Sequence, residues 1–157
     1  MNLPAYTNLA NLKICLAPSP KEMMEIDFSC FDSKWNEADY KEMQDQPSFN
    51  NWLLKVHDTI DVGMLSFNNI EPELEINRLG IHPEWRNRGF AKFMLEQLEI
   101  FARESKIESI WLEVNIFNKS AISLYNKFSF EEVGVRKNYF KNTRDDALLF
   151  KKIIKYD

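Results

Sequence analysis

The chain has 157 residues, of which 45% are hydrophobic and 28% charged, and its formal net charge is −4. This length and composition are typical of one globular domain that buries about two-thirds of its unfolded surface. The acidic balance argues against direct nucleic-acid binding, which needs a basic surface, and no apolar run is long enough to span a bilayer.

The cysteines and the N-terminus predict the compartment. Cys15 and Cys30 are the only cysteines, and with two histidines they are too few for a four-ligand zinc site, so we expect no metal. The start "MNLPAYTNLANLK" lacks the basic and apolar regions of a signal peptide. We expect a reduced, cytoplasmic protein with one domain over residues 1–157, in which residues 1–11 form a flexible lead.

The first part of the chain predicts a strand followed by two helices. Residues 12–17 alternate as a strand does. Ser19, Pro20 and Glu22 are typical of a helix start with a capping box. We expect that helix to bury four apolar side chains: Met23, Met24, Phe28 and Phe31. A shorter helix is expected to begin near Asn36.

The rest of the chain predicts strands around two further helices. Strands are expected over residues 51–56, 62–67, 74–81, 109–114, 130–135 and 146–153, and helices from Phe90 and over 118–128. Two hairpins flank a strand–helix–strand–helix order, which predicts an α+β or mixed α/β sheet.

The strand over residues 74–81 changes its pattern midway. Leu74 and Ile76 share one face, whereas Leu79 and Ile81 have the opposite parity. An inserted residue, a β-bulge, produces this switch and exposes backbone groups to a ligand. A strand that is buried on both faces is an equal alternative.

The helix that follows has an unusual charge at its start. Its apolar stripe is formed by Phe90, Met94, Leu98 and Phe101. Arg86, Arg88 and Lys92 surround its N-terminal end, where acidic residues are usual. Together with Gly89, the free N–H groups there predict a site for a phosphate group of a ligand. A solvated basic surface is the alternative. The spacing fits neither a Walker loop nor a dinucleotide fingerprint.

These residues carry a family resemblance. The segment "RNRGFA", Arg86 to Ala91, fits the Gln/Arg-x-x-Gly-x-Gly/Ala signature, and the chain resembles the Gcn5-related N-acetyltransferases from about Leu12 onward. The later segment is similar to the bacterial enzymes that acetylate the N-terminal alanine of a small-subunit ribosomal protein. The matching positions there are Leu112 to Val114, Asn118, Ala121, Ile122, Leu124, Tyr125, Phe130, Arg136, Asn138 and Tyr139. Ser129 and Phe140 depart from that pattern.

The resemblance implies a fold and a cofactor. It implies a mixed, mostly antiparallel central sheet of six to seven strands with about four flanking helices and a bulged strand before the cofactor helix. It implies acetyl-CoA as acetyl donor. The residues implied to bind it are Leu79, Gly80 and Ile81 of the strand, Asn87, Arg88, Gly89, Phe90, Ala91 and Lys92 of the helix start, and Asn118.

The resemblance also implies the catalytic residues. Glu113 lies in the apolar run "SIWLEV", which suits it to accept a proton as general base, although an ordinary strand glutamate is the alternative. Tyr125 is implied to protonate the leaving sulfur, although it borders an apolar stripe and core packing is the alternative. A backbone N–H of Leu79 or Ile81 would meet the oxyanion. His57 and His82 are expected at the surface.

Two classes of function stay open. One is an enzyme that acetylates an amine, with a protein N-terminus as the favoured acceptor and lysine or a small amine as variants. The other is a module that binds acetyl-CoA without turnover. The presence of both Glu113 and Tyr125 favours the enzyme, and "RKNYF" on the last hairpin favours a peptide acceptor, with Trp35 and Tyr139 expected to line its slot.

Overall fold

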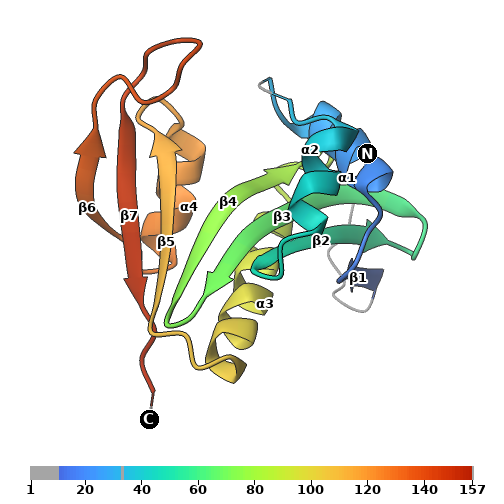
Figure 1. Cartoon of the computed structure of the whole chain (residues 1–157), viewed down its shortest axis with the longest axis horizontal. Coiled ribbons are helices and arrows are strands. Elements are labelled where there is room, and N and C mark those ends of the chain that lie inside the picture. Colours follow the sequence, from blue (N-terminus) through green and yellow to red (C-terminus); the bar gives the residue numbers. More distant parts are fainter. Residues whose placement is uncertain (1–10, 33, 157) are drawn as a thin grey trace. The chain divides into compact units, whose positions relative to one another are not determined.

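A computed structural model describes residues 11–32 and 34–156 of the chain. Its strands are β1 (Leu12–Cys15), β2 (Phe49–Val56), β3 (Ile60–Ile70), β4 (Glu73–Ile81), β5 (Ser109–Asn115), β6 (Glu131–Arg136) and β7 (Ala147–Ile153). Its helices are α1 (Pro20–Cys30), α2 (Glu37–Gln44), α3 (Phe90–Glu104) and α4 (Lys119–Lys127), with a 3-10 turn η3 (Pro83–Trp85) before α3. Figure 1 labels these elements.

The strands form one hydrogen-bonded sheet. Their order is β1-β2-β3-β4-β5-β7-β6. β4 and β5 are parallel, whereas the pairs β1–β2, β2–β3, β5–β7 and β6–β7 are antiparallel. The expected α/β class with a mixed sheet and about four helices is therefore confirmed.

The residues group into two compact units. The first unit contains the chain up to Asn68 together with Arg78–Leu98, and the second contains Asn69–Asn77 together with the chain from Glu99 onward. The expected lead, residues 1–11, lies outside the described residues except for Asn11, whose carbonyl accepts a hydrogen bond from the His57 N–H at 3.0 Å. The single domain over residues 1–157 stays a prediction. In the described ranges, no helix is both long and apolar enough to cross a membrane.

The helices α1 and α2 each begin with a capping box. The Ser19 hydroxyl accepts from the Glu22 N–H, and the Glu22 carboxylate accepts from the Ser19 N–H, each at 3.1 Å. Asn36 and Asp39 repeat this arrangement for α2, with distances of 2.9 and 2.7 Å. Each box pairs two backbone donors that a helix start leaves open. The predicted helix starts at Ser19 and Asn36 are confirmed.

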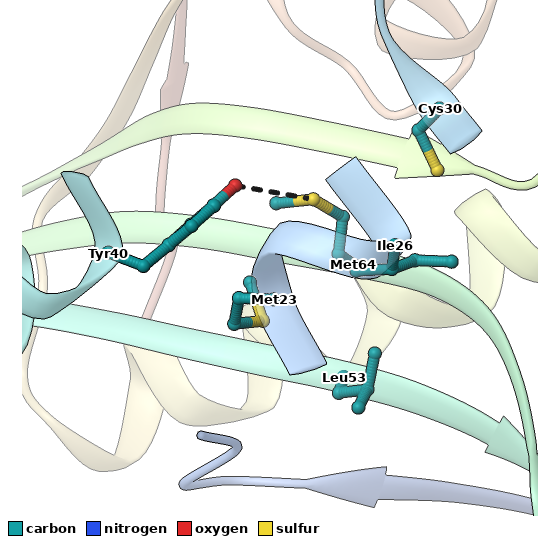
Figure 2. Packing of buried hydrophobic residues seen from close by; sticks show 6 residues of the cluster. All are labelled: Met23, Ile26, Cys30, Tyr40, Leu53 and Met64. Atoms are coloured by element: carbon teal, nitrogen blue, oxygen red, sulfur yellow. Dashed lines mark hydrogen bonds between the residues drawn. The ribbon is translucent and has the colours of Figure 1, made fainter. Parts of the chain in front are cut away.

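The buried face of α1 packs on the strands of the first unit. Figure 2 shows six side chains of this core: Met23, Ile26, Cys30, Tyr40, Leu53 and Met64. The Tyr40 hydroxyl lies 3.7 Å from the Met64 sulfur. The expectation that Phe28 is buried is wrong, because its side chain is 46% exposed. Phe28 lies about 200° around the helix from Ile26, so it faces away from the core.

The Asp27 side chain of α1 is a fully buried carboxylate. Its Oδ2 accepts hydrogen bonds from the Tyr40 hydroxyl and the Arg78 guanidinium, both at 2.5 Å, and its Oδ1 accepts from the Trp35 N–H at 2.9 Å. The Arg78 guanidinium lies over the rings of Phe31 and Trp35, at 4.3 and 4.4 Å. Burial, and then the bond to Asp27, raise the pKa of Tyr40. One carboxylate therefore joins α1, α2, the segment between them and β4.

The second unit is centred on β5. This strand pairs with β4 through Glu73–Ile76 on one side and with β7 along its whole length on the other. β6 pairs with β7, so β5, β7 and β6 lie side by side (Figure 1). Tyr125 of α4 contacts the rings of Phe130 and Phe150, with centroids 5.4 and 6.3 Å away. α4 is thereby fixed by aromatic packing.

β4 keeps the parity switch that the sequence shows. Leu74, Ile76 and Ile81 are all buried, although Ile81 is an odd number of residues from the other two. Register shifts occur between Leu54 and Lys55 of β2 and between Glu132 and Gly134 of β6. The bulge within β4 therefore stays a prediction.

Replacement of Asp27 by asparagine should destabilise the protein strongly. The Arg78 guanidinium, only 11% exposed, would lose its carboxylate partner. Breaking a buried pair in this way costs about 3–5 kcal/mol of unfolding free energy. Urea denaturation measures the loss.

The control is Asp58→Asn, because Asp58 pairs with Lys13 where both side chains are about two-thirds exposed, at 68% and 66%. Such a surface pair is worth about 1 kcal/mol or less. Equal losses in the two variants would contradict the role of Asp27.

Candidate active site

The turn before α3 presents backbone N–H groups. Asn87 and Gly89 adopt positive φ angles, of 61° and 81°. A Cβ added at Gly89 would meet no atom within 4 Å. The Gly89 carbonyl accepts the first α3 bond, from Phe93 N–H at 3.0 Å, and the first turn of α3 contains no acidic residue. Consecutive amides in such a turn, at a helix N-terminus, suit an anion.

The arginines of this turn have distinct tasks. Arg86 donates from Nε to the Ile81 carbonyl at 3.0 Å and from Nη2 to the Cys30 carbonyl at 3.2 Å, so its guanidinium braces the turn. Arg88 lies over the Trp85 ring at 4.6 Å and donates to the Glu84 carbonyl at 2.7 Å. The sequence suggested that both arginines supply positive charge to a ligand. In the structure, the Arg86 guanidinium instead donates hydrogen bonds to two backbone carbonyls.

Arg88 differs from Arg86 because one nitrogen of its guanidinium is unpaired within the described part of the chain. Its Nη1 is buried and has no hydrogen-bond partner among residues 11–32 and 34–156. Lys92, in contrast, is exposed, and its ammonium lies 3.9 Å from the Glu96 carboxylate. A fixed guanidinium with an unpaired N–H group is suited to binding an anion, and the roles of Arg88 and Lys92 in cofactor binding stay predictions.

The end of β4 lies next to this turn in the first unit. A Cβ added at Gly80 would come within 2.6 Å of the Phe31 ring, and one at Gly63 within 2.6 Å of the Ile81 side chain. Both glycines therefore permit close packing of α1, β3 and β4. The Arg86 side chain bonds to the Ile81 carbonyl, so the structure joins the end of β4 to the turn that precedes α3.

In the second unit, Glu113 is held by two donors. Its side chain is 15% exposed, and its Oε1 lies 2.7 Å from the Arg136 Nε. The Tyr139 hydroxyl donates a hydrogen bond to the same carboxylate, which raises the pKa of Tyr139. Burial, and then the charge of Glu113, raise the pKa of Glu75 on β4. Glu113 is thus part of a cluster of two carboxylates, a guanidinium and a phenol.

Two candidate site residues belong to the α4 region: Asn118 is the N-cap of the helix, and Tyr125 lies on its packed face. Asn118 caps the helix, with its Oδ1 accepting from the Ala121 N–H at 3.2 Å. Tyr125 is 6% exposed, and burial raises its pKa. At neutral pH its hydroxyl therefore keeps a proton. The roles of Asn118, Tyr125 and Glu113 stay predictions.

Sequence reasoning missed several charged partners. Asp27 occupies the stripe of Met23, Ile26 and Cys30, and an acid on an apolar stripe could have signalled a buried pair. Arg136 was noted only as a matching position, because the sequence does not show which strand neighbours Glu113. His57 is exposed, as expected, and His82 is half-buried, with its Nδ1 accepting from the Glu84 N–H. Within the described ranges, no group of three or more His, Cys, Asp or Glu side chains could hold a metal ion.

The sequence model of the acetyltransferase (GNAT) family matches residues 21–130. The chain belongs to this family and is an acetyltransferase. A Bacillus subtilis protein, provisionally named a ribosomal protein bS18-alanine N-acetyltransferase, is 28% identical over 126 residues, which cover 80% of this chain and 83% of that protein. The Escherichia coli K12 enzyme of that name is 30% identical over 79 residues, 49% of this chain and about half, 53%, of the enzyme.

Solved structures share the fold. The crystal structure of the ribosomal-protein-S18-alanine N-acetyltransferase from Escherichia coli superposes with a TM-score of 0.85 at 21% identity, covering 93% of this chain and 96% of that chain. A GNAT acetyltransferase from Elizabethkingia anophelis, solved with acetyl-CoA bound, gives a TM-score of 0.73 at 16% identity, with 91% and 98% covered. The fold that the resemblance implied is confirmed.

Proposed function

We propose that this acetyltransferase moves an acetyl group from acetyl-CoA to the α-amino group of a protein N-terminus, with an alanine-starting ribosomal protein as the favoured acceptor. The observation that carries the proposal is the Glu113 carboxylate, which is 15% exposed and held by defined donors. The bS18-alanine acetyltransferases among its relatives support the acceptor. Ribosomal proteins are made in the cytoplasm, so the proposal places the enzyme there.

The residues of the first unit fit the donor. Bound acetyl-CoA would supply the acetyl group as a thioester. The amides of Asn87 to Lys92 and the Arg88 guanidinium would hold its phosphates, because the turn is open at Gly89 and Arg88 has an unused N–H. Leu79 to Ile81 would hold the rest of the molecule, and the family resemblance implies that Asn118, the N-cap of α4 in the second unit, also takes part.

Glu113 would take the proton from the amine. An α-amino group titrates near ~7.7–8.0, whereas lysine titrates near ~10.4, so a carboxylate has far less work to do on an N-terminus. A base in a half-buried strand position is also shielded from bulk water. This difference favours an α-amino acceptor over lysine.

Tyr125 would return a proton to the leaving thiolate. Its hydroxyl carries a proton at neutral pH, as an ordinary tyrosine does, and burial raises its pKa further. Its ring packs against the rings of Phe130 and Phe150, which limits the movement of the hydroxyl. Tyr139, hydrogen-bonded to Glu113, would lie beside the incoming peptide and narrow its path.

A peptide panel tests the acceptor. Peptides with a free N-terminal alanine should be acetylated on the α-amino group, and the same peptides with a blocked N-terminus and an internal lysine should not, because the lysine amine is almost fully protonated. Fragment-ion mass spectrometry locates the acetyl group.

Efficient ε-acetylation of the blocked peptides would move the enzyme to the lysine or small-amine class. Tight acetyl-CoA binding with no acetylation of any peptide or of small amines would favour a module that binds without turnover.

Replacement of Gly89 by valine should weaken acetyl-CoA binding at least tenfold, or ~1.4 kcal/mol. A β-branched residue is strained at a φ of 81° and would cover the amides of the turn. Isothermal titration calorimetry measures the affinity, and circular dichroism verifies folding. Gly134→Ala is the control, since a Cβ there makes only ordinary contacts, at 3.8 Å or more. Unchanged affinity in a folded Gly89→Val protein would remove this turn from the site.

A further inference from the structure

We infer that Arg136 is a positioning residue: together with the loop that follows it, Arg136 holds the Glu113 carboxylate in its working orientation. The inference rests on the proposed function, because it requires Glu113 to accept the proton. It adds a residue that acts through Glu113.

The ion pair is asymmetric in its exposure. The Arg136 side chain is 55% exposed, whereas that of Glu113 is 15% exposed, and Nε lies 2.7 Å from Oε1. Pairs with an exposed partner add little to stability. A short, directional N–H···O bond nevertheless limits the rotation of a carboxylate. The expected consequence of the pair is therefore orientation.

The loop after β6 is built to present both donors. The Asp146 carboxylate accepts from the Lys137 ammonium at 3.0 Å and from the Asn138 N–H at 2.9 Å. These two residues separate Arg136 from Tyr139. The bond from Asn138, and then that from Lys137, lower the pKa of Asp146 below its usual value. The charged form of the Asp146 carboxylate is therefore the form that holds this loop.

The same loop is tied to the end of β5. The Ile116 N–H donates to the Asp146 carbonyl at 3.0 Å, and the Asn115 Nδ2 donates to the Asp145 Oδ2 at 2.9 Å. Glu113 lies two residues before Asn115 on that strand. Arg136 and Tyr139 are therefore next to a loop that is hydrogen-bonded to the end of β5, the strand of Glu113. These bonds limit how far the two donors can move from the Glu113 carboxylate.

The charges around Glu113 give the Arg136 pair a second effect, which is to offset the repulsion between Glu113 and Glu75. In the second unit, the groups that face Glu113 are Arg136 on β6, Tyr139 on the following loop and Glu75 on β4. Lys151 of β7 lies over the Trp111 ring instead, at 4.6 Å. Without Arg136, the two carboxylates would repel each other with no cation of this cluster between them, and Glu113 would turn away.

Steady-state kinetics on the alanine-starting peptide tests the inference. Arg136→Ala should lower kcat about tenfold or more, the scale of a displaced catalytic group. The acceptor KM and the acetyl-CoA affinity should stay near wild type, because the inference gives Arg136 no part in binding either molecule. Arg136→Lys should recover part of the rate, since an ammonium can still pair with Glu113. Lys141→Ala, which removes an exposed cation of the same loop, should leave the kinetics unchanged.

The double variant separates this inference from the proposed function. If Arg136 acts through Glu113, Arg136→Ala should have no further effect in a Glu113→Gln background. Independent, multiplying losses would overturn the inference, as would a wild-type rate for Arg136→Ala when Glu113→Gln is slow. A wild-type rate for Glu113→Gln would overturn the proposed base and the inference with it.

Discussion

The first unit depends on the burial of one carboxylate. Asp27 is fully buried, and such a charge is tolerated only when its oxygens are fully bonded. Its donors come from Tyr40 of α2, from the Trp35 backbone and from Arg78 of β4. Arg78 directly precedes Leu79, the first residue of β4 in the proposed cofactor site. The hydrogen bond from Arg78 to Asp27 therefore also holds β4 in place directly before Leu79.

Two carboxylates of this chain illustrate two different uses of charge. Asp27 has short bonds to donors that are themselves buried or nearly so, and a group with such partners is suited to hold structure. Glu113 is paired with an arginine that is 55% exposed, and it has a second carboxylate, Glu75, near it. A carboxylate whose partner is open to solvent is more accessible to a substrate than one that is enclosed by buried donors. The environment of Asp27 suits it to holding the fold, and that of Glu113 is consistent with the catalytic role that we propose for it.

Much of the fold was predictable because its signals are local. The capping boxes at Ser19 and Asn36 and the start of α3 at Phe90 each depend on a few neighbouring residues. The element order that follows from them was enough for the fold class. The face of α1 was harder, because Phe28 is strongly apolar and only the strands beneath the helix decide which side is covered.

The residues of the candidate site could be named from the sequence, but the contacts between them could not. The glycine and basic residues before α3 indicated an anion site by their types alone. That Arg86 binds the Ile81 and Cys30 carbonyls, while Arg88 retains an unused nitrogen, depends on a turn geometry that the sequence does not show. Likewise, the pairing of Glu113 with Arg136 joins residues far apart in the chain and follows from the β5–β7–β6 order.

The most direct test of the account is the pH–rate profile of Glu113→Gln beside wild type and Tyr125→Phe. Glu113→Gln should lose ~10²-fold in kcat near neutral pH, the scale of a positioned base. That loss should shrink as pH rises past the α-amino group's own titration near ~7.7–8.0, since the amine is then already neutral. Tyr125→Phe should also be slow, but high pH should not restore it, because the leaving sulfur still lacks its proton donor. Near-wild-type rates in both variants, or a Glu113→Gln loss that is constant with pH, would contradict the account.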